Sequence, residues 1–109
     1  MEMLKLEIYI PESHFHVLQK ALQSVDAGHI GQYDSCLSYS HVKGMWRPLE
    51  GANPHIGEEG SISEEEELKV EVNIRKSKLV STLQAIRRVH PYEEPVINVI
   101  PLYGERFDG

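Results

Sequence analysis

Residues 4–10 read LKLEIYI, a stretch in which apolar and polar side chains alternate without a break. Residues 68–75, LKVEVNIR, repeat the same alternation later in the chain. Because successive side chains of a strand point to opposite faces, each stretch predicts a strand that is buried on one face and exposed on the other. Two such strands need a layer that covers their apolar face.

Each of these strands is followed by a segment with the apolar spacing of a helix. After Pro11, apolar residues recur every three or four positions until Gly28, which is typical of an amphipathic helix. Ser77 can cap a second helix through its hydroxyl, and the same spacing then continues to His90. Pro91 disfavours the helical conformation at the residue before it, so we predict that the second helix ends at His90.

Two further strands complete the predicted order. In residues 33–42, YDSCLSYSHV, several apolar side chains share a parity, and residues 96–100, VINVI, follow Pro95 at a position where a strand tolerates proline. The order β-α-β-β-α-β with right-handed crossovers favours an α+β, ferredoxin-like sandwich. We therefore predict a four-stranded antiparallel sheet with two helices on one face and the first and third strands in its centre.

The middle of the chain has a different composition. Residues 44–66 contain several glycines and prolines and show no sustained periodicity, so we predict a long loop at about 44–66 within a single domain spanning 1–109. Loops longer than about 12–15 residues are usually functional or disordered, and bulky Trp46 and Ile56 indicate that the first half is ordered. The acidic run at 64–67 is interpreted as a solvated lead-in to the next strand.

The sheet face opposite the helices is expected to keep apolar groups uncovered. Tyr9, Tyr39 and the apolar residues of the strand at 96–100 contribute to this expectation. An exposed apolar patch usually marks an interface. We therefore predict a homo-oligomer.

Composition narrows the classes of function. The 109 residues carry a net charge of −6, with 17 acidic and 11 basic residues, which disfavours nucleic acid as a partner because such binding relies on basic patches. The single cysteine, Cys36, cannot form an internal disulfide, which favours a reducing, cytoplasmic location. No signal peptide and no run near the ~20 apolar residues of a membrane helix are recognisable, so we expect no membrane partner.

The motif HPYEEP at 90–95 carries the most chemistry in the chain. His90, Glu93 and Glu94 offer one imidazole and two carboxylates, ligand types that suit zinc and other divalent ions. A purely structural interpretation also explains the motif, because the prolines end the helix, His90 suits the negative helix end and Tyr92 can pack. Adjacent glutamates point to opposite sides of an extended chain, so the three remain metal candidates and no ligand is assigned.

Two glycine-containing motifs supply the other candidates. GHIGQYD at 28–34 brings His29 and Tyr33, either as a helix end and strand entry or as a turn whose amides hold an anion. GANPHIG at 51–57 brings Asn53 and His55, where a surface turn competes with a ligand or acid–base role. Cys36 is interpreted as a small strand residue, because a thiol nucleophile needs a positioned base.

Three stretches together resemble the PII/CutA-like module that is inserted within NIF-three-like (NGG-one-interacting-factor-three) proteins. They are GHIGQYDSC at 28–36, RPLEGANPHIG at 47–57 and RRVHPYEEPVINVIPL at 87–102, and the resemblance covers nearly all of the chain. The HPYE portion is also similar to the matching corner of the CutA divalent-cation tolerance proteins. Both resemblances imply a ferredoxin-like, PII/CutA-like fold that forms trimers.

The resemblance also implies what this chain does not carry over. In NIF-three-like proteins the dinuclear metal site belongs to a larger flanking domain that 109 residues cannot contain, so its ligands are not transferred. A free-standing copy of the insert is implied, with the role of a cap or regulatory module. Trp46 stands where a smaller aromatic residue is expected. The motif positions that match are His29, Gly31, Tyr33, Pro48, Gly51, Asn53, Pro54, Gly57, His90, Pro91, Tyr92, Glu93 and Pro95.

Three hypotheses of function follow. The first is a noncatalytic module of the NIF-three-like family that binds a small molecule or ion or has a regulatory role, acting as a trimer, with the 44–66 loop and the GHIG and HPYEEP corners contributing to a cleft. The second is a CutA-like protein that binds a divalent metal ion, the one cofactor that the residues suggest. The third is a small metal-assisted hydrolase with His and Glu as acid and base, for which no nucleophile can be assigned. We therefore assign no catalytic residue.

Overall fold

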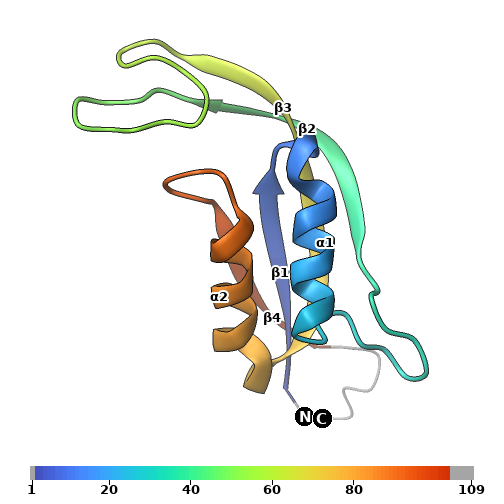
Figure 1. The fold of residues 1–109 in the computed structure, drawn as a ribbon. Coiled ribbons are helices and arrows are strands. Elements are labelled where there is room, and N and C mark those ends of the chain that lie inside the picture. The colour runs from blue at the N-terminus through green and yellow to red at the C-terminus, as the bar shows by residue number, and fades with distance from the viewer. Residues whose placement is uncertain (1, 104–109) are drawn as a thin grey trace.

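A computed structural model describes residues 2–103 of the chain. Four strands form one antiparallel sheet in the order β2-β3-β1-β4, and two α-helices, each preceded by a short 3-10 turn, lie side by side on one of its faces (Figure 1). The strands are β1 (Met3–Ile10), β2 (Ser38–Trp46), β3 (Ser63–Arg75) and β4 (Ile97–Leu102), and the helices are α1 (Phe15–Ser24) and α2 (Leu79–Val89). The predicted ferredoxin-like fold, with the first and third strands in the centre, is confirmed.

The core lies between the two central strands and the helices. Every second residue of β1 is buried, and the register sets Leu6 opposite Val72 and Ile8 opposite Val70, all four on the helix side. Leu18 of α1 and Ile86 of α2 are fully buried against them. β1 and β4 are neighbours in the sheet. Met3 at the start of β1 lies opposite Leu102 at the end of β4.

The second helix begins differently from the sequence prediction. A 3-10 turn, Lys76–Lys78, precedes α2. The N-cap residue of α2 is Lys78, and its side chain makes no capping hydrogen bond. The predicted cap by Ser77 is therefore wrong, because that residue lies inside the 3-10 turn. The predicted end is confirmed, since His90 takes an extended conformation and its N–H donates to the Ile86 carbonyl.

The long loop is shorter than predicted because both flanking strands extend into it. β2 continues to Trp46 and β3 begins at Ser63, so the irregular segment is 47–62. The acidic run at 64–67 is not a lead-in but part of β3, paired with residues 42–45 of β2. Backbone pairing does not depend on side-chain polarity, and Glu64 to Glu66 keep their carboxylates in solvent. We call residues 43–67 the arm; it bends away from the sheet and projects beyond the helices (Figure 1).

The face opposite the helices is charged at its centre. Lys5 Nζ lies 2.8 Å from Glu71 Oε2 and 3.5 Å from Glu7 Oε2, and Lys69 Nζ lies 3.6 Å from the same Glu7 oxygen. Tyr39 was predicted to lie on this face, but its ring packs on the helix side, 4.9 Å from that of Phe15. That part of the prediction is wrong, because the weak alternation of β2 did not fix its parity. Exposed apolar side chains occur on the arm, in β4 and next to it; they include Met45, Leu49, Ile62, Val96 and Val99.

None of the helices in residues 2–103 is long and apolar enough to span a bilayer.

Thr82 of α2 gives a first testable prediction. Its side chain is fully buried, and its hydroxyl oxygen has no hydrogen-bond partner within the part of the chain that the structure describes. A buried polar group without a partner costs free energy, so the isosteric Thr82→Val is expected to raise the free energy of unfolding by about 1 kcal/mol, measured by chemical denaturation. Thr82→Ser, which keeps the hydroxyl and removes the methyl, is the matched control and should destabilise. A less stable Thr82→Val protein would contradict the assignment.

Candidate functional site

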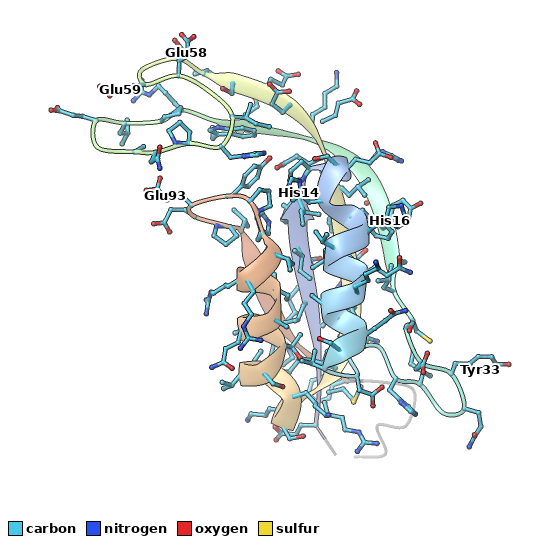
Figure 2. The ribbon with its side chains drawn as sticks, in the orientation of Figure 1. His14, His16, Tyr33, Glu58, Glu59 and Glu93 are labelled. Atoms are coloured by element: carbon cyan, nitrogen blue, oxygen red, sulfur yellow. The ribbon has the colours of Figure 1, made fainter. Side chains whose placement is uncertain are left out.

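A cleft of about 600 Å³ lies where the arm bends over the corner formed by residues 90–96. Figure 2 labels Glu93 on this corner, below the arm. The lining comes from the arm, the corner, the last part of β1 and the start of β4, and most of it is apolar. The cleft is therefore built by segments that are far apart in the sequence.

His90 fixes the corner to the sheet. Its ring Nδ1 accepts the Tyr92 backbone N–H at 3.1 Å, so Nε2 carries the proton and donates to the Tyr9 carbonyl oxygen at 2.7 Å. Burial lowers the pKa of His90, although the bond to the Tyr9 carbonyl opposes that shift. Both ring nitrogens of the neutral imidazole are engaged. Its role in this copy is to hold the helix-to-strand corner in place.

Tyr92 joins the corner to the arm. Its hydroxyl donates to Glu67 Oε2 at 2.8 Å, and its ring lies 5.6 Å from that of Trp46 and 6.1 Å from that of His55. Burial, with a smaller contribution from the bond to Glu67, raises the pKa of the Tyr92 hydroxyl well above its usual range. The hydroxyl therefore stays protonated and keeps donating to the arm.

Two further hydrogen bonds hold the arm in its bent position. Glu93 Oε2 accepts the Asn53 backbone N–H at 2.9 Å, across 40 residues of sequence. Trp46 Nε1 donates to the Ile56 carbonyl at 3.0 Å, which closes the 47–62 segment on itself. Hydrogen bonds of the fold itself therefore hold the walls of the cleft.

The sequence predicted one group of these residues and missed another. Five predicted candidates gather at this end of the molecule: Asn53, His55, His90, Tyr92 and Glu93. Trp46 and Glu67 also line the cleft but were assigned only to local packing and to a solvated run. Trp46 is the only tryptophan of the chain and stands in a glycine- and proline-rich segment, a signal from which the sequence could have predicted its role.

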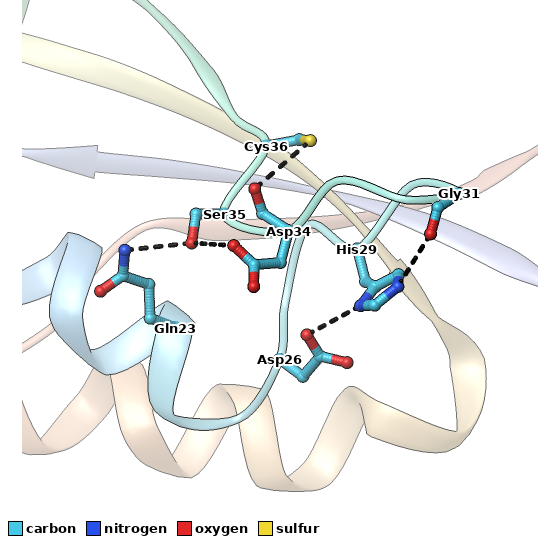
Figure 3. Close-up of polar contacts among 7 residues, drawn as sticks. All are labelled: Gln23, Asp26, His29, Gly31, Asp34, Ser35 and Cys36. Atoms are coloured by element: carbon cyan, nitrogen blue, oxygen red, sulfur yellow. Dashed lines mark hydrogen bonds and ion pairs between the residues drawn. The ribbon is translucent and has the colours of Figure 1, made fainter.

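His29 and Tyr33 lie at the other end of the chain fold. Figure 2 labels Tyr33 far from Glu93, and Tyr33 is 74% exposed. His29 lies between Asp26 Oδ1 at 3.1 Å and the Gly31 carbonyl at 3.0 Å (Figure 3), and the bond to Asp26 raises the pKa of His29. The GHIG corner therefore does not meet the other two motifs within one copy. A cleft that includes all three motifs would need more than one copy.

The three metal candidates do not form a ligand set in one copy. In the described residues, 2–103, no group of three His, Cys, Asp or Glu side chains is placed to hold a metal ion. His90 uses both ring nitrogens, Glu93 accepts from Asn53, and Glu94 is exposed at the cleft. Metal binding stays a hypothesis.

Comparison with known proteins shows which proteins this chain is similar to. No protein-family model matches the chain. Its sequence is 38% identical over 101 residues to the "GTP cyclohydrolase 1 type 2 homolog" of Halalkalibacterium halodurans, covering 93% of this chain and 27% of that protein. The Bacillus subtilis protein of the same name is 36% identical over 98 residues, covering 90% and 26%. A solved structure of a Bacillus cereus protein related to NIF3 superposes with a TM-score of 0.83 and 34% identity, over 94% of this chain and 26% of that one.

This chain is similar to one segment of the NIF3-related proteins. The resemblance predicted from the sequence is thereby confirmed. This chain spans about a quarter of the length of the curated relatives that it matches.

More distant structures share the fold of this chain. The periplasmic divalent cation tolerance protein CutA of Archaeoglobus fulgidus superposes with a TM-score of 0.70 at 20% identity, covering 95% of this chain and 88% of that one. The GlnK protein of B. subtilis superposes with a TM-score of 0.65 at 20% identity, covering 94% and 86%. These two comparisons establish the CutA/PII-like fold alone.

The buried imidazole of His90 predicts a pH dependence of stability. In the unfolded chain a histidine has a pKa of about 6.5, whereas burial lowers the pKa of folded His90. Below about pH 6.5 the unfolded chain therefore takes up a proton that the folded chain does not. The contribution of His90 is fully present above pH 6.5 and is lost as the pH falls through the folded pKa. We expect the free energy of unfolding to decrease with acidification in this window.

Comparison of variants isolates this residue. In His90→Gln, the slope of unfolding free energy against pH between 7 and 5 is expected to be smaller than in the wild type. His16→Gln removes an exposed histidine of α1 and should keep the wild-type slope. Equal slopes for His90→Gln and the wild type would refute the assignment.

Proposed function

We propose that this NIF3-like chain is a noncatalytic binding or regulatory module, and that its binding site is the cleft between the arm and the 90–96 corner. The observation that carries the proposal is the shape of this cleft: about 600 Å³, lined mainly by apolar side chains with a few polar groups, as small-molecule sites usually are. Two of its three carboxylates, those of Glu67 and Glu93, accept hydrogen bonds that support the walls, and the His90 imidazole, which does not line the cleft, holds the corner to the Tyr9 carbonyl. This usage favours binding over acid–base chemistry.

Trp46 provides a direct test of the proposal. It is the only tryptophan in the chain and it lines the cleft, so its emission reports on occupancy. We expect at least one member of a matched panel, 2-phenylethylammonium, 2-phenylethanol and phenylacetate, to change the emission saturably. Leu49→Asp, which charges an exposed apolar residue of the lining, should weaken binding. No saturable change with any member, together with no co-purifying partner, would count against a binding role.

The proposal includes a homo-oligomer, with a trimer favoured. In its support, Met45 and Ile62 of the arm are 64% and 68% exposed, and β2 and β4 are edge strands of the sheet. Exposed apolar groups beside unpaired strand edges are typical of interfaces. Light scattering coupled to size exclusion is expected to give about three times the 12.4 kDa of one chain.

Charge substitutions test where the copies meet. The double variant Met45→Lys and Ile62→Lys is expected to lower the measured mass toward that of one chain. Val80→Lys changes an apolar side chain of α2 that is also 68% exposed, and it should leave the mass unchanged. A wild-type protein that stays monomeric at high concentration would overturn this part of the proposal.

Binding of a divalent metal ion is the second candidate function. It is supported by the adjacent carboxylates of Glu93 and Glu94, which both line the cleft. Metal content of protein prepared without chelators, compared between the wild type and the double variant Glu93→Gln and Glu94→Gln, tests it. The same metal content in both proteins would exclude this pair as ligands.

A further inference from the structure

We infer that the cleft takes an organic cation, a compound with an ammonium group on an apolar body. The inference rests on the proposed function, because it assigns a chemical class of ligand to the same site. Three features carry it: a buried carboxylate that lacks a cationic partner, a pair of aromatic rings and the charge of the lining.

Glu67 is the first feature. It is a cleft-lining residue that is only 6% exposed, and its Oε2 accepts the Tyr92 hydroxyl. Within residues 2–103, no Lys, Arg or His lies at ion-pair distance from it, and the two lysines nearest in the β2–β3 ribbon pair elsewhere: Lys69 with Glu7 and Lys43 with Glu64. Buried carboxylates in folded proteins are normally paired with a cation. A cationic ligand in the cleft would supply that partner.

The aromatic rings of Trp46 and Tyr92 are the second feature. Both line the cleft, and their centroids are 5.6 Å apart with an angle of 52° between the ring planes. The negative face of an aromatic ring attracts a cation, most strongly where water is excluded. The Tyr92 ring stands next to the Glu67 carboxylate because its hydroxyl bonds to it, and the Trp46 ring lies next to that of Tyr92. One cationic group can therefore interact with charge and with aromatic faces in the same place.

The remaining lining residues indicate the charge and polarity of the ligand. Glu93 and Glu94 add two carboxylates, whereas Arg47 is the only lining residue with a cationic side chain, so the lining carries a formal charge of −2 from three acids and one base. The other walls are apolar, with Pro48, Leu49 and Val96 among them. This combination favours a cation with an apolar body over a small anion or a sugar.

The test compares the three panel compounds, which differ in their head group. At low ionic strength, 2-phenylethylammonium is expected to bind about tenfold more tightly than 2-phenylethanol, as read from Trp46 emission, which corresponds to about 1.4 kcal/mol. Phenylacetate is expected to bind more weakly than the alcohol. The advantage of the ammonium compound should decrease as salt is added, because salt screens charge.

Substitution at Glu67 isolates the charge. Glu67→Gln keeps an oxygen that can accept the Tyr92 hydroxyl, so the ammonium compound is expected to lose about tenfold in affinity while the alcohol is unaffected. Glu58→Gln removes the same charge from an exposed position of the arm that does not line the cleft, and it should change neither affinity. Thermal unfolding without ligand shows that each variant is folded.

The outcomes separate the inference from the proposed function. If the alcohol or phenylacetate binds as tightly as the ammonium compound, the inference fails while the cleft remains a binding site. If no compound changes the emission, the inference fails, and the proposed binding role fails with it when no partner co-purifies. If the emission of the free protein depends on its own concentration and no compound competes, a second copy fills the cleft, and the assignment to a small cation is overturned.

Discussion

Gly28→Ala is expected to lower the free energy of unfolding by about 3 kcal/mol or more, the largest effect of the substitutions considered. Gly28 has a φ of +81°, where a side chain is strained, and a Cβ at this position would overlap the backbone carbonyl of Cys36. The neighbouring backbone cannot easily move, because the Gly28 N–H donates to Asn73 of β3 and its carbonyl accepts the Cys36 N–H. Thermal and chemical unfolding measure the loss.

Gly31→Ala is the matched control for this prediction. Gly31 also has a positive φ, +57°, but among the described residues, its own chain neighbours apart, no atom would lie within 4 Å of an added Cβ. Its cost should be limited to the left-handed backbone, about 1 kcal/mol. Each kcal/mol corresponds to a decrease in Tm of roughly 4–8 °C for a chain near this size. Equal losses for the two variants would show that the close approach to Cys36 does not matter.

Tyr92→Ala is expected to have the second largest effect, a loss of about 2–3 kcal/mol. The substitution removes ring contacts with Trp46, His55 and His90 and leaves Glu67 without its donor. Because Tyr92 is one of two side chains that link the corner to the arm, the arm should also lose its fixed position. Unfolding measures the stability, and a change in Trp46 emission of the folded variant reports the change around the arm.

Two variants control the Tyr92 experiment. Tyr33→Ala removes the same side chain from a site that is 74% exposed, and its cost should stay within about 0.5 kcal/mol. Tyr92→Phe keeps the ring and removes only the hydroxyl, so it should cost about 1 kcal/mol and largely preserve the emission. A Tyr92→Ala protein as stable as Tyr33→Ala would rule out the linking role.

Most of the fold could be predicted because its local signals agree with one another. The alternation is unbroken in residues 4–10 of β1 and 68–75 of β3, and these are the two strands whose buried residues face the helices from the centre of the sheet. The orientation of β2 was harder to predict. Ser, His and Gly are interspersed among its apolar residues, so the sequence did not show which side chains face the helices. Tyr39 was therefore assigned to the wrong face. The strand at 64–67 was missed because strand pairing does not require apolar side chains.

The site could be predicted only in part, since it depends on long-range packing. His90 and Tyr92 stood out through their motif, yet their partners, Tyr9 and Glu67, lie 81 and 25 residues away. No local pattern indicates that the arm bends over the corner. The separation of His29 from the other candidates has the same origin, because glycine-rich turns look alike in sequence wherever they lie in the fold.

The pairing of Met3 with Leu102 bears on the longer relatives. A unit whose entrance and exit are adjacent can be accommodated within one surface turn of a host polypeptide without separating the flanking parts of that host. Tyr9, near the opposite end of β1, lines the cleft, so the cleft and such an attachment point lie at opposite ends of that strand. Grafting the unit into an unrelated carrier at a single loop is accordingly expected to leave the cleft unobstructed.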